Sequence, residues 1–211
     1  MTVAENPLYK DLVKQFGDAL HDAAFITEKP KQIISVSPKL DLALGGGVPE
    51  GSLFIMTGPE KIGKTVTALS FCANAQSQER FVYYGNIEGR LKKRDLEGIR
   101  ELQLGPEQFQ MVGSSEGNIL SGEDYLGIFD KVVHGHPKSV AVVDSFSALA
   151  AEAELAGELK DIQVMSIQKT QAKWCRRIGN VLPINNVTVV GITHMMANVS
   201  SFGSRKTKTE K

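Results

Sequence analysis

The chain has 211 residues, of which 42% are hydrophobic and 23% are charged, so it can bury a core, and its length favours one domain. Lys and Arg total 24 and Asp and Glu total 24, which excludes a globally basic nucleic-acid-binding protein. Any contact with DNA must therefore come from local basic patches.

The N-terminal residues contain no basic segment followed by an apolar run, and no stretch approaches ~18 consecutive apolar residues. We therefore expect a protein that is neither exported nor membrane-spanning. The two cysteines, Cys72 and Cys175, each lie inside an apolar stretch. This usage favours the reducing cytoplasm over a disulfide framework, and we expect both side chains to serve in packing.

Apolar side chains recur at near-helical spacing within residues 7–20, after a proline suited to a first turn. They are Leu8, Leu12, Val13, Phe16 and Leu20. This pattern predicts a short amphipathic helix. We interpret residues 27–38 as a connector and the glycine-rich residues 40–51 as a turn before the main domain. The expected division is an N-terminal oligomerisation helix and linker, residues 1–30, and a core, residues 31–211.

The rest of the chain alternates between strand and helix patterns. Strands are predicted at 52–57, 81–86, 109–113, 139–144 and 187–194, and helices at 65–76, 91–102, 121–133 and along an apolar stripe from Val164 to Leu182. Ser121 and Asp124 have the spacing of a capping box. The alternation predicts an α/β fold in which helices sandwich a mostly parallel central sheet, with function at the carboxyl ends of the strands.

Residues 58–65, GPEKIGKT, fit the phosphate-binding pattern G-x-x-x-x-G-K-[ST] between a predicted strand and a predicted helix. In such a P-loop, backbone N–H groups and the positive end of the helix face phosphate oxygens. Lys64 would reach the β- and γ-phosphates, and Thr65 would offer its hydroxyl to Mg²⁺. The nucleotide-binding residues predicted here are Gly58, Pro59, Glu60, Lys61, Ile62, Gly63, Lys64, Thr65 and Val66.

Three polar residues at or just after strand ends are candidates for the remaining chemistry. Asp144 fits the acidic residue that P-loop enzymes use to hold Mg²⁺, or it is an ordinary aspartate that starts a turn. Glu88 would polarise the attacking water as a general base, or it is an exposed carboxylate. His194 would contact the γ-phosphate and pass that contact to the following loop, although an isolated strand-end histidine is usually structural.

Cationic residues gather among Gly and Ser in residues 200–211, SSFGSRKTKTEK. A flexible cationic loop of this kind suits the phosphate backbone of DNA. The predicted DNA-binding residues are Arg205, Lys206, Lys208 and Lys211.

Several segments together resemble the RecA family of recombinases, bacterial and phage-encoded, from near the N-terminus to the last residue. Residues 37–65 are similar to the family's stretch leading into its phosphate loop, and VAVVDSFSAL resembles its Mg²⁺-site strand. VKQFGDAL resembles the helix that packs on the neighbouring subunit of the filament, and AELAGEL, residues 153–159, resembles the start of the first DNA-binding loop.

The resemblance implies a RecA-like core with Glu88 as the catalytic glutamate and Asp144 in the Mg²⁺ site. It implies a DNA-dependent ATPase that uses ATP and Mg²⁺ and forms filaments on single-stranded DNA for homologous recombination and repair. The filament would be a homo-oligomer joined through the N-terminal helix, in the cytoplasm. The family commonly has glutamine where this chain has His194. Some tailed-phage recombinases resemble it in having histidine, so we expect a phage source and the host cytoplasm.

Two features depart from the family pattern. The acidic and aromatic residues that frame adenine in bacterial RecA are not evident in GRLKKRDL, residues 89–96. The family's chains also continue well beyond Lys211, with further strands and with cationic residues that reach a neighbour's ATP. We therefore expect an incomplete core, an unpaired sheet edge and little activity of this chain alone.

Two alternatives remain open at this stage. A RecA-fold helicase or other ring ATPase shares the same P-loop, although the N-terminal helix and AELAGEL argue against it. The chain could also be a non-catalytic ATP-binding module that regulates a full-length recombinase, which tight ATP binding without turnover would favour.

Overall fold

The structure is a computed structural model of the chain, in which residues 6–20, 30–156 and 166–195 are described. The chain divides into two units, Met1–Gln32 and Ile33–Lys211. The first contains helix α1 (Pro7–Phe16) and the 3₁₀ turn η2 (Gly17–Ala19). The Asn6 side chain accepts a hydrogen bond from the Leu8 amide, so the predicted helix begins with a cap and a proline.

The second unit is built on a five-stranded sheet with the order β3-β7-β6-β4-β5. The strands are β3 (Leu53–Gly58), β4 (Val82–Asn86), β5 (Phe109–Val112), β6 (Val140–Asp144) and β7 (Thr188–His194). All four pairings are parallel, which confirms the α/β fold with a parallel central sheet. Every residue of β6 is buried, as its continuous apolar sequence predicts for a strand covered on both faces.

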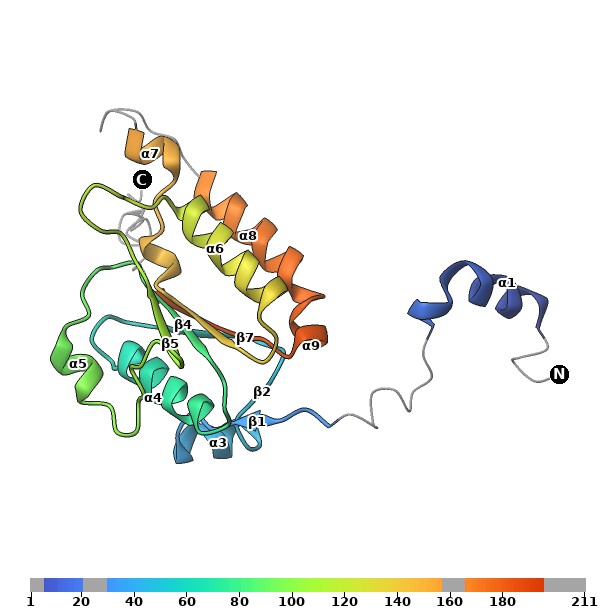
Figure 1. Cartoon of the computed structure of the whole chain (residues 1–211), viewed down its shortest axis with the longest axis horizontal. Coiled ribbons are helices and arrows are strands. Elements are labelled where there is room, and N and C mark those ends of the chain that lie inside the picture. Colours follow the sequence, from blue (N-terminus) through green and yellow to red (C-terminus); the bar gives the residue numbers. More distant parts are fainter. Residues whose placement is uncertain (1–5, 21–29, 157–165, 196–211) are drawn as a thin grey trace, which may run out of the picture. The chain divides into compact units, whose positions relative to one another are not determined.

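Helices cover the two faces of the sheet (Figure 1). Helix α4 (Lys64–Gln76) packs on one face, and α6 (Gly122–Gly135), α8 (Ser166–Gly179) and α9 (Leu182–Asn185) contribute to the core on the other. Shorter elements complete the unit: β1 (Ile33–Ile34), α3 (Pro38–Leu44), β2 (Val48–Pro49), α5 (Lys93–Glu97), η3 (Phe146–Ala148) and α7 (Glu152–Ala156). In the described part of the chain no helix combines the length and apolarity that a membrane span requires.

The capping box and the packing role of the cysteines are confirmed. Ser121 Oγ accepts a hydrogen bond from the Asp124 amide at 3.1 Å, and the Ser121 amide donates to Asp124 Oδ2 at 2.9 Å. Cys72 is buried and Cys175 is half-buried, both are free thiols, and each packs in or against an apolar core. Burial raises the pKa of both thiols, which keeps them unreactive.

Two local predictions are wrong. Helix α3 (Pro38–Leu44) begins at the last residue of the predicted connector and continues into the predicted turn, because Ser37 caps the Leu40 amide and Gly45 ends the helix at a left-handed φ of 74°. The helix predicted over 91–102 is only the five residues of α5, Lys93–Glu97, with Gly98 as the C-cap. The residues after Gly98 form turns instead, and their apolar side chains Ile99 and Leu102 pack against the core on the α4 side of the sheet.

Gly191 of β7 provides a test of how tightly the sheet packs under η3. A methyl group at this position would lie 2.7 Å from Ile55 Cδ1 and 2.8 Å from Phe146 Cδ2. Overpacking of this kind costs about 1–3 kcal/mol. We expect Gly191→Ala to lower the free energy of unfolding by about that amount in urea titrations.

Gly127→Ala is the matched control, because Gly127 is exposed on α6 and an added methyl group meets nothing within 4 Å. Alanine is favoured over glycine inside a helix by about 1 kcal/mol, so this variant should be stabilised. A loss of stability of the same size in both variants would contradict the packing described for Gly191.

Candidate active site

The candidate residues meet because parallel strands end at one edge of the sheet. Gly58 at the end of β3 lies in register with His194 of β7, and Asn86 of β4 lies in register with Asp144 of β6. Glu88 follows β4 by two residues, and its segment is fixed by the Ile87 amide, which donates to the Asp144 carbonyl at 2.9 Å.

The phosphate loop lies between β3 and α4 and is folded around its own lysine. Lys64 is 8% exposed, and its Nζ donates to the carbonyls of Gly58 at 2.8 Å and Pro59 at 2.6 Å. Gly63 has a φ of 95°, a conformation that side chains disfavour, and it is the N-cap of α4. The loop therefore has the shape in which the first turn of α4 can receive phosphate oxygens.

Asp144 is buried at the end of β6 and is held by two hydroxyl groups. Its Oδ2 accepts hydrogen bonds from Thr65 Oγ1 at 2.9 Å and from Tyr84 Oη at 2.7 Å. Burial raises the pKa of Asp144, and the charge of Glu88 adds to this, while the two hydroxyl groups oppose the shift.

The residues around Asp144 fit a Mg²⁺ ion. The Thr65 hydroxyl and the Asp144 carboxylate are hard oxygen donors, and Mg²⁺ usually binds one or two such groups together with water and substrate phosphates. Within the described ranges no group of three or more His, Cys, Asp or Glu could hold a metal alone. A site shared between protein and nucleotide needs no such group.

Glu88 carries hydrogen bonds from two separate segments of the chain. Its Oε1 lies 2.6 Å from His194 Nε2, which donates, and accepts from Ser145 Oγ at 2.8 Å. Arg90 Nη1 lies 3.3 Å from Oε2. Burial alone would raise the pKa of Glu88, but these donors and the charge of Arg90 outweigh it and lower the pKa. The carboxylate therefore stays ready to accept a hydrogen bond.

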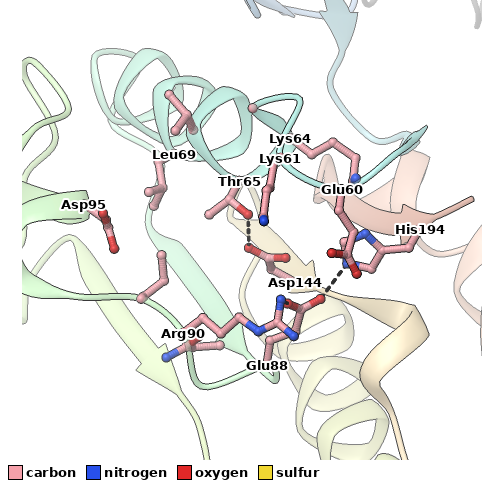
Figure 2. A pocket seen from close by; sticks show the side chains of 14 residues that line it. Glu60, Lys61, Lys64, Thr65, Leu69, Glu88, Arg90, Asp95, Asp144 and His194 are labelled. Atoms are coloured by element: carbon pink, nitrogen blue, oxygen red, sulfur yellow. Dashed lines mark hydrogen bonds and ion pairs between the residues drawn. The ribbon is translucent and has the colours of Figure 1, made fainter.

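One cavity of about 380 Å³ collects these side chains (Figure 2). Its lining contains these predicted residues: Glu60, Lys61, Gly63, Lys64, Thr65, Val66, Glu88, Asp144 and His194. Gly58 and Pro59 contribute carbonyls to Lys64 instead, and Ile62 is 59% exposed. The predicted DNA-binding residues Arg205, Lys206, Lys208 and Lys211 lie outside the described residues.

Sequence reasoning missed part of this site. The cavity is also lined by Leu69, Asn86, Arg90, Leu91 and Asp95. Tyr84 and Ser145 were missed as well, although Ser145 directly follows a predicted site residue. Their partners are 60 and 57 residues away in the sequence, so no local pattern could reveal these bonds.

Tyr84 offers a test of how Asp144 is held. Because Tyr84 is fully buried and its hydroxyl donates to a buried carboxylate, Tyr84→Phe should lower the free energy of unfolding by about 1–2 kcal/mol. Chemical denaturation measures this change. Tyr9→Phe, on the exposed surface of α1, is the control and should be neutral. Equal stability of the two variants would show that the bond to Asp144 contributes nothing.

The sequence of the chain is similar to known proteins over most of its length. The sequence profile of the RecA N-terminal domain matches residues 9–210. Similar curated proteins include "Protein RecA" of Streptomyces venezuelae, 30% identical over 97% of this chain and 51% of the relative, and "Protein RecA" of Mycolicibacterium smegmatis, 32% identical over 86% and 52%. The chain thus spans about half the length of these relatives. The expectation of a phage source is not tested by them. The profile match over nearly the whole chain shows that this chain belongs to the RecA family.

Proposed function

We propose that this chain binds ATP with Mg²⁺ and hydrolyses it as part of a recombinase that assembles on single-stranded DNA. The observation that carries the proposal is that one cavity at the carboxyl ends of the strands brings the candidate residues together. The cavity is lined by the P-loop lysine, by a threonine hydroxyl hydrogen-bonded to an aspartate, and by a glutamate with a lowered pKa that accepts a hydrogen bond from a histidine. These residues are Lys64, Thr65, Asp144, Glu88 and His194.

Lys64 and the start of α4 would bind the phosphates. The ammonium group now donates to two carbonyls of its own loop, and it would exchange these for β- and γ-phosphate oxygens. Thr65 and Asp144 would hold Mg²⁺, which neutralises charge on the phosphates. Asp144 would keep its bond from Tyr84 throughout and so stay oriented.

Glu88 would accept the proton of the attacking water. Both donors from Ser145 and His194 occupy Oε1, so Oε2 is the oxygen left for water, with Arg90 3.3 Å away. A glutamate whose pKa is lowered stays ionised at neutral pH, as a general base must.

His194 would report the γ-phosphate to the segment that follows β7. Its imidazole bonds Glu88 and its amide donates to Ser147 Oγ at 2.9 Å, so one residue contacts both the base and η3. A γ-phosphate that attracts the imidazole would change both contacts, and the adjoining Met195 begins the segment toward the predicted DNA-binding residues.

Residues 1–30 would form an oligomerisation helix and linker, and residues 31–211 would form the core. In this division helix α1 would join neighbouring subunits of a cytoplasmic filament. Its apolar side chains are exposed, among them Leu8 at 64% and Phe16 at 56%. An apolar helix face of this kind suits burial against a second copy. The DNA contacts would come from Arg205, Lys206, Lys208 and Lys211.

Lys64→Ala should lower the affinity for ATP by about a hundred-fold, because the phosphates lose the point charge of the loop. Isothermal titration calorimetry measures the change. Lys93→Ala removes the same charge from an exposed position outside the cavity and should bind like the parent. Unchanged affinity in the Lys64 variant would remove the P-loop from the proposal.

Glu88→Gln should keep ATP and Mg²⁺ bound but slow hydrolysis by roughly 10²–10⁴, the range expected for a lost general base. Single-turnover hydrolysis should be measured in a version of the chain extended to the length of its relatives. Glu101→Gln, at an exposed glutamate, is the control. Turnover near the parent rate in the Glu88 variant would make Glu88 a structural carboxylate.

The complete function requires that DNA stimulate hydrolysis. In the extended version, single-stranded DNA should raise the ATPase rate, and filaments should form with ATP and dissociate after hydrolysis. Electron microscopy and a coupled ATPase assay measure both. ATP hydrolysis that ignores DNA, without filaments, would contradict the recombinase assignment and leave only an ATPase.

A further inference from the structure

A second cavity, of about 410 Å³, meets the nucleotide-binding cavity along a shared wall. The side chains that line both cavities are Glu60, Glu88, Arg90 and His194. On the proposed function, on which this inference rests, Glu88 faces the γ-phosphate, so the shared wall marks the γ-phosphate end. Arg90 is the residue of this wall with a permanent positive charge, because arginine stays protonated at physiological pH.

Carboxyl groups gather at the γ-phosphate end of the cavity. Glu88 has a lowered pKa and stays ionised, and Glu60 adds a second carboxyl group to the same wall. A γ-phosphate adds further negative charge, which hydrolysis redistributes over its own oxygens and the bridging oxygen. Lys61 and Lys64 also line the cavity, but both belong to the phosphate loop. A cation on the Glu88 side would therefore balance charge that the loop reaches only from the opposite side.

Arg90 has the position and the free donors for this role. Its Nη1 lies 3.3 Å from Glu88 Oε2, the oxygen left for the attacking water, and its side chain extends toward Glu88 (Figure 2). The side chain is 73% exposed, and among the described residues Glu88 is its only ion-pair partner. A guanidinium group carries five N–H donors in a planar fork, so the contact with Glu88 uses only part of them.

We propose that Arg90 is a catalytic residue that stabilises the phosphoryl group during its transfer, from within the same chain that carries the P-loop. In this step the water oxygen forms a bond to the γ-phosphorus while the bond from that phosphorus to the β–γ bridging oxygen breaks. The electron pair of the broken bond stays on ADP. The proton of the water goes to Glu88 Oε2 and from there to solvent.

The position of the water explains how one guanidinium group can serve both partners. A water bonded to Oε2 of Glu88 must lie about 3–3.5 Å from the phosphorus that it attacks. A guanidinium group beside Oε2 can therefore donate to the carboxylate and to an oxygen of the transferred group together. The second contact strengthens as the phosphoryl group leaves ADP, so Arg90 favours the transition state over bound ATP.

The test measures the binding of ADP to the chain by calorimetry, in the presence of Mg²⁺, with and without fluoroaluminate, which takes the place of the transferred phosphoryl group. In the parent, fluoroaluminate should raise the affinity for ADP. Arg90→Ala should lower the affinity for ADP with fluoroaluminate by about ten- to a hundred-fold, the range for a hydrogen bond to a charged group. Its affinity for ADP alone should match that of the parent, because ADP has no γ-phosphate.

Two further substitutions calibrate this result. Arg90→Lys keeps the positive charge without the planar fork, so it should lose less affinity for ADP with fluoroaluminate than Arg90→Ala does. Arg100→Ala is the matched control, because Arg100 is 93% exposed and lies outside both cavities. This variant should bind ADP like the parent, with or without fluoroaluminate.

A double-mutant cycle separates direct contact with the phosphoryl group from an effect that passes through Glu88. In a Glu88→Gln background, Arg90→Ala should still weaken the binding of ADP with fluoroaluminate, because a contact with the phosphate oxygens does not need the carboxylate. An arginine that only orients Glu88 or keeps it ionised would have no effect in that background.

The outcomes distinguish the two proposals. Four results would overturn the catalytic role of Arg90 and leave the P-loop in place: no gain from fluoroaluminate in the parent, parent-like binding in Arg90→Ala, an equal loss for ADP alone, or a loss that disappears in the Glu88→Gln background. A parent that binds neither ADP nor ATP would overturn the proposed function and this inference together.

Discussion

The buried carboxylate of Asp144 is the interaction on which the site depends. Oδ2 of Asp144 accepts hydrogen bonds from Thr65 at the start of α4 and from Tyr84 of β4. The backbone carbonyl of Asp144 accepts a hydrogen bond from the amide of Ile87, next to Glu88. A carboxylate at this depth is costly, as its raised pKa shows, and the two hydroxyl donors offset part of that cost. Because these partners come from different segments, the position of Asp144 sets the distance between the phosphate loop and Glu88.

The hydrogen bond between His194 and Glu88 links the proposed γ-phosphate sensor to the proposed general base. A carboxylate oxygen that already accepts two bonds is a weaker acceptor for a third, so Ser145 and His194 orient Glu88 and also restrict how it meets water. Any ligand that draws the imidazole away changes the base itself. The proposed sensing of the γ-phosphate and the proposed activation of water are therefore not independent in this chain, since one side chain contacts both.

The sequence predicted those parts of the fold whose signals are local. The phosphate loop was recognisable because glycine, lysine and threonine must stand at fixed spacing, and Asp144 and His194 because buried parallel strands are continuous apolar runs that end in polar residues. The contacts of Tyr84 and Ser145 depend on strand register, which no short pattern encodes. Helix α3 was missed although Ser37, Pro38 and Gly45 are standard start and stop signals, because three glycines favoured a turn.

The position of β3 bears on how stiff the phosphate loop can be. Among the described residues β3 is an outer strand, paired only with β7, and its side chains are half-buried or exposed where those of β6 are all buried. Ile55, in its middle, is 40% exposed. Among the described residues, the strand that carries the phosphate loop is thus hydrogen-bonded to one neighbouring strand, β7, whereas the strand that carries Asp144 lies between β7 and β4. A strand paired on one side has fewer restraints than a strand paired on both, so the sheet restrains the phosphate loop less than it restrains Asp144 in the described part of the chain.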